Sequence, residues 1–174
     1  MKKTSRTKNP PSAGRPLAAV FEGQCRLAIP GVPAKALQDS YPLSCDIVFS
    51  AARDAVTLVD FESIRTRAYA AKVGPTTVTN RTTVHLVSAR PGQLSPDGHF
   101  AIPVVLHFDH SVDLPFYEED SDLAVTLSTR ERGGAALDAR GGVTLVGEGT
   151  FAGGHLAGKP CRLVYEGTVS PQPW

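Results

Sequence analysis

Apolar and polar residues alternate along much of this chain, and the alternation is clearest over residues 98–112, GHFAIPVVLHFDHSV. The large apolar side chains of this run share one face of an extended backbone: Phe100, Ile102, Val104, Leu106 and Phe108. A period of two with β-branched and aromatic residues predicts a strand near the centre of a sheet. Pro103 has no N–H to donate to a neighbouring strand, so we expect a bulge or a loss of pairing there.

The same period predicts strands elsewhere in the chain, over residues 20–29, 44–52, 55–70, 76–90, 123–129, 143–151 and 161–169. Gly, Pro and Asp separate these segments, and only residues 34–40 have the composition of a short helical turn. Many strands at this spacing predict an all-β fold. We favour a single antiparallel β-barrel, calycin-like in architecture, over a β-sandwich. The first and last strands share a Cys-Arg-Leu sequence, which is compatible with their pairing to close the barrel.

The length of 174 residues suits one domain with a substantial core, which we place at residues 19–170, followed by a short tail at 171–174. Residues 1–18 contain five basic residues and no acidic one, and we expect a disordered basic arm there. The rest of the chain therefore holds 13 basic and 17 acidic residues. This balance lacks the basic surface stripe of a nucleic-acid-binding domain, so no nucleic-acid partner is predicted.

Targeting signals are weak in this sequence. The N-terminus begins like a secretory signal, but it lacks the apolar core that such a signal needs. No apolar run approaches the roughly 20 residues of a membrane-spanning helix. We therefore expect a cytoplasmic protein without a membrane partner, and the sequence leaves a homo-oligomer open.

Three cysteines, Cys25, Cys45 and Cys161, each fall on the apolar face of a predicted strand. An odd number gives no complete disulfide framework, so we expect buried, reduced thiols. No cofactor is predicted. Residues 153–159 have the Gly spacing of a phosphate-binding loop, but Pro160 stands where Ser or Thr would hold magnesium, and a strand rather than a helix follows.

His107, Asp109 and His110 precede an acidic stretch at residues 113–122, and such side chains can bind a divalent metal. Alternation, however, sends the two histidines to opposite faces, with His110 on the face of Phe108. No Cys-x-x-Cys pair is present either. The sequence therefore predicts no metal site, and we interpret 113–122 as a solvated connection that follows a strand end.

Asp60 and Glu62 are candidate catalytic residues, because they fall in register with Val56 and Leu58. If that face is interior, two carboxylates point into an apolar cavity. Desolvation and mutual repulsion would then leave one of them able to give or take a proton near neutral pH. In the alternative, the face with Val59 and Phe61 is buried and both acids are in water.

Four further residues complete the candidate site. His85 is a candidate catalytic acid or base, and its alternative is a hydrogen-bonded structural position in a strand. Tyr69, Phe108 and Tyr165 are candidate ligand-binding residues that supply aromatic walls or hydroxyl groups to a cavity. Their alternative is ordinary packing in the core.

Two functions fit this pattern. In the first, a barrel of about eight strands encloses one small, largely apolar molecule. The protein then carries this molecule or folds it toward a cyclised or isomerised product without a cofactor. Small or polar inward positions would leave space for it, and the candidates are Gly23, Ala51, Asp60 and Thr82. In the second, side chains fill the barrel, and the protein is a non-catalytic structural or protein-interaction module.

Overall fold

The computed structural model describes residues 14–31, 41–70, 77–113, 116–130, 140–154 and 156–172, with the backbone alone described at 41, 65–70, 116 and 117. These residues form nine strands: β1 (Leu17–Ala28), β2 (Tyr41–Phe49), β3 (Ala55–Ala70), β4 (Thr77–Ala89), β5 (Gly92–Leu94), β6 (Phe100–Asp113), β7 (Phe116–Thr129), β8 (Gly141–Ala152) and β9 (Pro160–Pro171). Within these ranges there is no helix that could cross a membrane. The predicted helical turn at 34–40 and residues 1–13 of the predicted arm lie outside the described residues.

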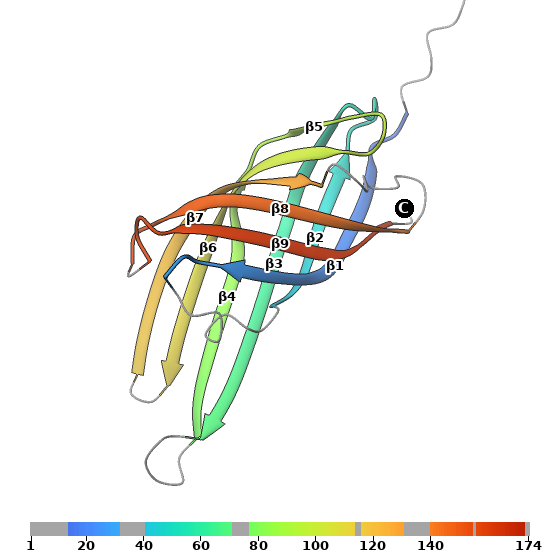
Figure 1. Cartoon of the computed structure of the whole chain (residues 1–174). Coiled ribbons are helices and arrows are strands. Elements are labelled where there is room, and N and C mark those ends of the chain that lie inside the picture. The colour runs from blue at the N-terminus through green and yellow to red at the C-terminus, as the bar shows by residue number, and fades with distance from the viewer. Residues whose placement is uncertain are drawn as a thin grey trace, which may run out of the picture.

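Eight of these strands close into an antiparallel barrel (Figure 1). Each barrel strand pairs with the next barrel strand along the chain, so that β4 pairs with β6 rather than with the short β5. The last strand, β9, returns to pair with β1. The short β5 lies between β3 and β6 and follows directly on β4. The predicted all-β barrel and the predicted pairing of the first and last strands are therefore confirmed. Closure pairs both edges of the sheet within the barrel itself.

The inward positions of the barrel are occupied by large apolar side chains. The largest of those that are fully buried are Tyr165, Phe21, Phe49, Phe61, Ile47, Ile102, Leu106, Leu123, Leu127, Leu163, Val56 and Val169. Aromatic rings meet edge to face in this core, with ring centroids 6.3 Å apart for Phe49 and Phe100 and 5.7 Å apart for Phe61 and Tyr165. Side chains from all sides of the wall thus fill the middle of the barrel.

A β-bulge in β3 changes which residues face inward. The register with β2 shifts between Asp46 and Ile47, which leaves Val59 as an extra residue on β3. Leu58 and Phe61 are both buried as a result, whereas Val59 is 58% exposed. The uninterrupted alternation expected for this strand is therefore wrong, because one extra residue exchanges the inward and outward positions beyond it.

A second bulge lies in β4, opposite the region of Pro103. The register of β4 with β6 shifts between Leu86 and Ser88, and the extra residue, Val87, is 55% exposed. Pro103 itself is exposed, and its carbonyl accepts a hydrogen bond of 3.0 Å from the Arg90 N–H. Beside it β6 changes partner from β4 to β5, so the missing N–H falls where the ladder is already interrupted. The expected irregularity at Pro103 is confirmed.

The acidic stretch after the central strand is itself a strand. The ladder between β6 and β7 runs without a shift from Ala101 to Asp113, where Asp113 pairs with Phe116. The expectation of a solvated connection over residues 113–122 is therefore wrong. Pairing with β6 satisfies the backbone, and the acidic side chains remain in water because Asp120 and Asp122 occupy outward positions.

Several glycines occur where the strands approach too closely for a side chain. Gly23 and Gly167 are partners in the β1–β9 ladder, and a Cβ on either one would collide with backbone atoms of the other strand. A Cβ on Gly149 would likewise collide with the Ala124 carbonyl of β7. A glycine at this position permits the close approach.

Two long hairpins extend the wall beyond the closed part of the barrel. The β2–β3 ladder ends at Glu62, and the β7–β8 ladder ends at Asp122. The ladders β3–β4, β4–β6 and β6–β7 continue past these points. The β4–β6 ladder, for example, reaches Val112 of β6. Four adjacent strands thus project past one end of the barrel (Figure 1), and we call this end the mouth.

Candidate functional site

The inner face of the mouth carries polar side chains from three adjacent strands. Thr82 of β4 pairs with His110 of β6, and His110 pairs with Glu119 of β7. Each is half-buried and lies two residues from a buried, inward-facing position of its own strand. The Thr82 hydroxyl lies 3.0 Å from Nδ1 of His110, within hydrogen-bonding distance. The fold therefore places a hydroxyl, an imidazole and a carboxylate on neighbouring strands at the mouth.

Below this row, apolar side chains form a floor. A small cavity of about 10 Å³ remains there, enough for about one water molecule. Its walls are Cys25, Leu27, Phe61, Ser63, Val84, Phe108 and Tyr165. Two of the three predicted ligand-binding residues, Phe108 and Tyr165, are thus brought together. The side chain of the third, Tyr69, lies outside the described residues.

Buried thiols surround the Tyr165 phenol. Burial raises the pKa of Tyr165 well above its usual value, and the neighbouring Cys25, Cys45 and Cys161 raise it further. Burial also raises the pKa of the Cys25 thiol to about 12, although a hydrogen bond with Tyr165 lowers it in part. All three cysteines are free and buried, which confirms the prediction of unpaired core thiols. These groups stay protonated and neutral, so the cavity is an uncharged environment.

Two buried serines hold the rim of the mouth together. The Ser63 hydroxyl donates a 2.6 Å hydrogen bond to the Pro42 carbonyl of β2. The Ser121 hydroxyl lies 3.0 Å from the Ala152 carbonyl and 2.8 Å from that of Gly153, at the end of β8. Each serine ties a projecting strand to the neighbouring strand that stops, so both are satisfied structural residues.

The predicted catalytic residues lie on the other side of the wall. Asp60 and Glu62 are exposed, which is the alternative in which both acids are in water. An Asp60 carboxylate oxygen accepts a 2.8 Å hydrogen bond from the Phe61 N–H. Glu62 pairs across the ladder with His85, which is also exposed. The structure thus brings Glu62 and His85 together, but it separates them from Phe108 and Tyr165 by the thickness of the sheet.

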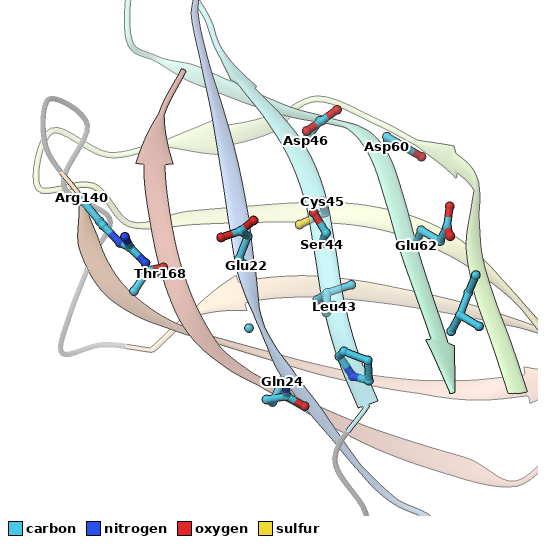
Figure 2. A pocket seen from close by; sticks show the side chains of 13 residues that line it. Glu22, Gln24, Leu43, Ser44, Cys45, Asp46, Asp60, Glu62, Arg140 and Thr168 are labelled. Atoms are coloured by element: carbon cyan, nitrogen blue, oxygen red, sulfur yellow. The ribbon is translucent and has the colours of Figure 1, made fainter. Parts of the chain in front are cut away.

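The outer carboxylates border an open groove of about 690 Å³ over β1, β2 and β3. Figure 2 shows Glu22, Asp46, Asp60 and Glu62 along this groove, with Arg140 at its far side. Arg140 is the one basic side chain among the described residues that line it. Four carboxylates against one guanidinium give the groove a negative potential that attracts cationic groups.

The sequence analysis identified some of the residues at the mouth and missed others. Thr82 was a predicted inward polar position, and His110 was placed on the face of Phe108, but neither was linked to a site. Glu119 was missed because its segment was interpreted as a connection rather than a strand. Among the described residues, no three His, Cys, Asp or Glu side chains are grouped so that they could hold a metal ion.

Comparisons of the chain with protein-family models, with curated proteins and with solved structures found no match. No relative therefore supplies a role for any residue of this chain.

Proposed function

We propose that this protein binds a small, largely apolar organic molecule at the mouth of its barrel. The observation that carries the proposal is the junction of an apolar floor with convergent polar groups. Phe61, Val84 and Phe108 supply the floor, and Thr82 and His110 lie directly above it. Apolar walls with a few placed polar groups are the usual composition of a small-molecule site.

The packing of the barrel supports the mouth as the place where such a molecule binds. Ligand sites usually have volumes of roughly 300–1,000 Å³, whereas the cavity in the floor measures about 10 Å³. A molecule therefore rests on the floor, against the inner face of the four projecting strands, rather than in the filled middle of the barrel. Its apolar part contacts Leu27 and Phe108, and a polar atom reaches the Thr82 hydroxyl or the His110 ring.

The same arrangement serves either a carrier or a cyclase or isomerase. A carrier needs only the apolar floor and one hydrogen bond that fixes orientation. A cyclising or isomerising enzyme additionally holds the flexible molecule in a reactive shape and moves a proton. His110 is the imidazole that faces the mouth, so it is the proposed proton donor or acceptor in that case.

Filling the mouth tests the proposal. Thr82→Phe places a ring in the site, and Thr83→Phe is the matched control, because Thr83 is the next residue of β4 and points outward. A phenyl ring that takes about 60 Å² of contact from a ligand removes about 1.5 kcal/mol, or roughly tenfold in affinity. The fluorescent apolar probe 1-anilinonaphthalene-8-sulfonate reports binding, and circular dichroism confirms that both variants fold.

We expect Thr82→Phe to weaken probe binding about tenfold and Thr83→Phe to leave it unchanged. Native mass spectrometry of protein purified from its own cell should also show a retained small molecule. Equal probe affinity in the two folded variants, with no retained molecule, would refute binding at the mouth.

The outer groove supports a second candidate function. If the filled barrel is only a scaffold, its negative groove is the surface that contacts a partner, and a basic protein segment is the fitting chemistry. The same mass spectra distinguish the two candidates. A retained protein partner in place of a small molecule selects the interaction module.

A further inference from the structure

The outer surface carries a second constellation, separate from the mouth. Glu62 of β3, His85 of β4, His107 of β6 and Asp122 of β7 are successive partners across three ladders. They form one row on the outside of the barrel, perpendicular to the strands, because residues paired across a ladder point to the same side. Neither the apolar floor nor the polar row of the mouth includes any of them.

The two histidines at the centre of this row lie against each other. Their ring centroids are 5.0 Å apart, and their planes are inclined by 50°. His85 is exposed, and the side chain of His107 is 25% exposed. Both rings therefore remain accessible to a solute ion.

A carboxylate orients one of the two rings. Nδ1 of His107 lies 2.7 Å from an Asp122 carboxylate oxygen, which accepts the Nδ1 hydrogen of the neutral ring. This hydrogen bond leaves the lone pair of His107 on Nε2. Histidines that bind metals commonly have such a carboxylate partner on their other nitrogen.

The local charge also favours a cation. An Asp120 carboxylate oxygen lies 3.8 Å from Nε2 of His107, and Glu62 stands beside His85 on the opposite side. Negative groups close to two imidazoles lower the free energy of a bound dication. The row therefore combines two nitrogen ligands, one oriented lone pair and a negative surrounding.

We propose that His85 and His107 together bind a divalent transition-metal ion of the zinc class, with water completing its coordination. Imidazole nitrogen suits Zn²⁺, Cu²⁺ and Ni²⁺, whereas Mg²⁺ and Ca²⁺ prefer oxygen. Because the site lies on the outer surface, metal binding and binding at the mouth are independent. One can fail without the other.

His99 offers a matched control elsewhere in the barrel. Its Nε2 lies 3.7 Å from an Asp97 carboxylate oxygen, and its Nδ1 lies 3.0 Å from the Thr129 hydroxyl. It thus has a carboxylate neighbour, as His107 does, but these two neighbours of its ring nitrogens are oxygen atoms and not a second imidazole. If pairing of the two imidazole rings creates the metal site, replacing His99 should leave the affinity for the metal unchanged.

Calorimetric titration with Zn²⁺ in a buffer that does not bind metals tests the proposal on the full chain. We expect one site in the wild type, and at least a tenfold weaker affinity in His85→Ala and in His107→Ala. Asp122→Asn should weaken binding by about 10- to 100-fold through loss of the oriented ring. His99→Ala should bind as the wild type does. Thermal unfolding without metal checks that each variant folds.

The pH dependence supplies a further readout. Metal competes with protons for imidazole nitrogen, so the affinity should fall as the solution is made acidic. No binding heat with the wild type would overturn the proposal. So would an unchanged affinity in folded His85→Ala, or an equal loss in His99→Ala.

Discussion

The buried thiols make the stability of the fold sensitive to alkali. Cys25, Cys45 and Cys161 are 4%, 3% and 3% exposed. Burial raises the pKa of Cys25 and Cys161 to about 12 and also raises that of Cys45. An unfolded chain would ionise the same thiols near the ordinary value of about 8.5. Above that pH the folded state keeps protons that the unfolded state releases.

The sign and size of the effect follow from proton linkage. The stability that the folded protein gains from its protonated thiols is fully present below about pH 8.5. This stability is lost as the pH rises toward the pKa values of the thiols in the folded state. Each pH unit in this window removes about 1.4 kcal/mol per thiol. Three thiols together should therefore lower the free energy of unfolding by about 4 kcal/mol between pH 9 and pH 10. That is a large part of the 5–15 kcal/mol typical of a domain.

Urea unfolding followed by circular dichroism, repeated between pH 7.5 and pH 10, measures this loss. The unfolded Tyr165 phenol, with an ordinary pKa of about 10, begins to ionise only near this upper limit, so the thiols account for most of the loss. Cys25→Ala should reduce the slope between pH 9 and pH 10 by about one third, whatever its stability at pH 7.5. A flat wild-type profile would refute the reasoning, as would an unchanged slope in Cys25→Ala. Rapid reaction of all three thiols of the folded protein with a soluble disulfide reagent at pH 8 would contradict their burial.

Two further pairs of variants test the barrel wall by the same unfolding measurement. Gly149→Ala should cost about 1–3 kcal/mol, because its Cβ meets a backbone carbonyl of β7. Gly142→Ala on the same strand should stay within about 0.5 kcal/mol, because the nearest atom to its Cβ is 3.9 Å away. Similar costs for the two would argue against the close approach of β7 and β8. Phe61→Ala should cost about 3–5 kcal/mol, whereas Val59→Ala should cost less than about 1 kcal/mol. The opposite order would show that the β3 bulge is misplaced.

One short motif contributes side chains to both faces of the barrel wall. In the sequence His-Phe-Asp-His at residues 107–110, the first and last residues are both histidines. His107 faces outward, beside His85 and Asp122, whereas His110 faces the mouth beside Thr82. Residues close in sequence thus belong to two different proposed sites. A strand in a barrel wall exposes successive side chains to opposite environments.

The sequence alone determined the architecture of this protein. A period of two, with turns of Gly and Pro between the segments, is enough to identify strands and to assign most inward faces. The buried cysteines and the inward position of Phe108 follow from that pattern. These features are local, because each depends on the pairing geometry of a strand with whatever strand lies beside it.

Only the tertiary structure decided where chemistry can occur. The bulge at Val59 placed Asp60 and Glu62 outside, although simple alternation put them on the face of Leu58. Register across strands that are distant in the chain brought Thr82 to His110, and His85 to His107. Neither effect is encoded in a single segment. One inserted residue or a shift in register by one position exchanges the two faces of a strand, and the packing of the whole barrel selects among these registers.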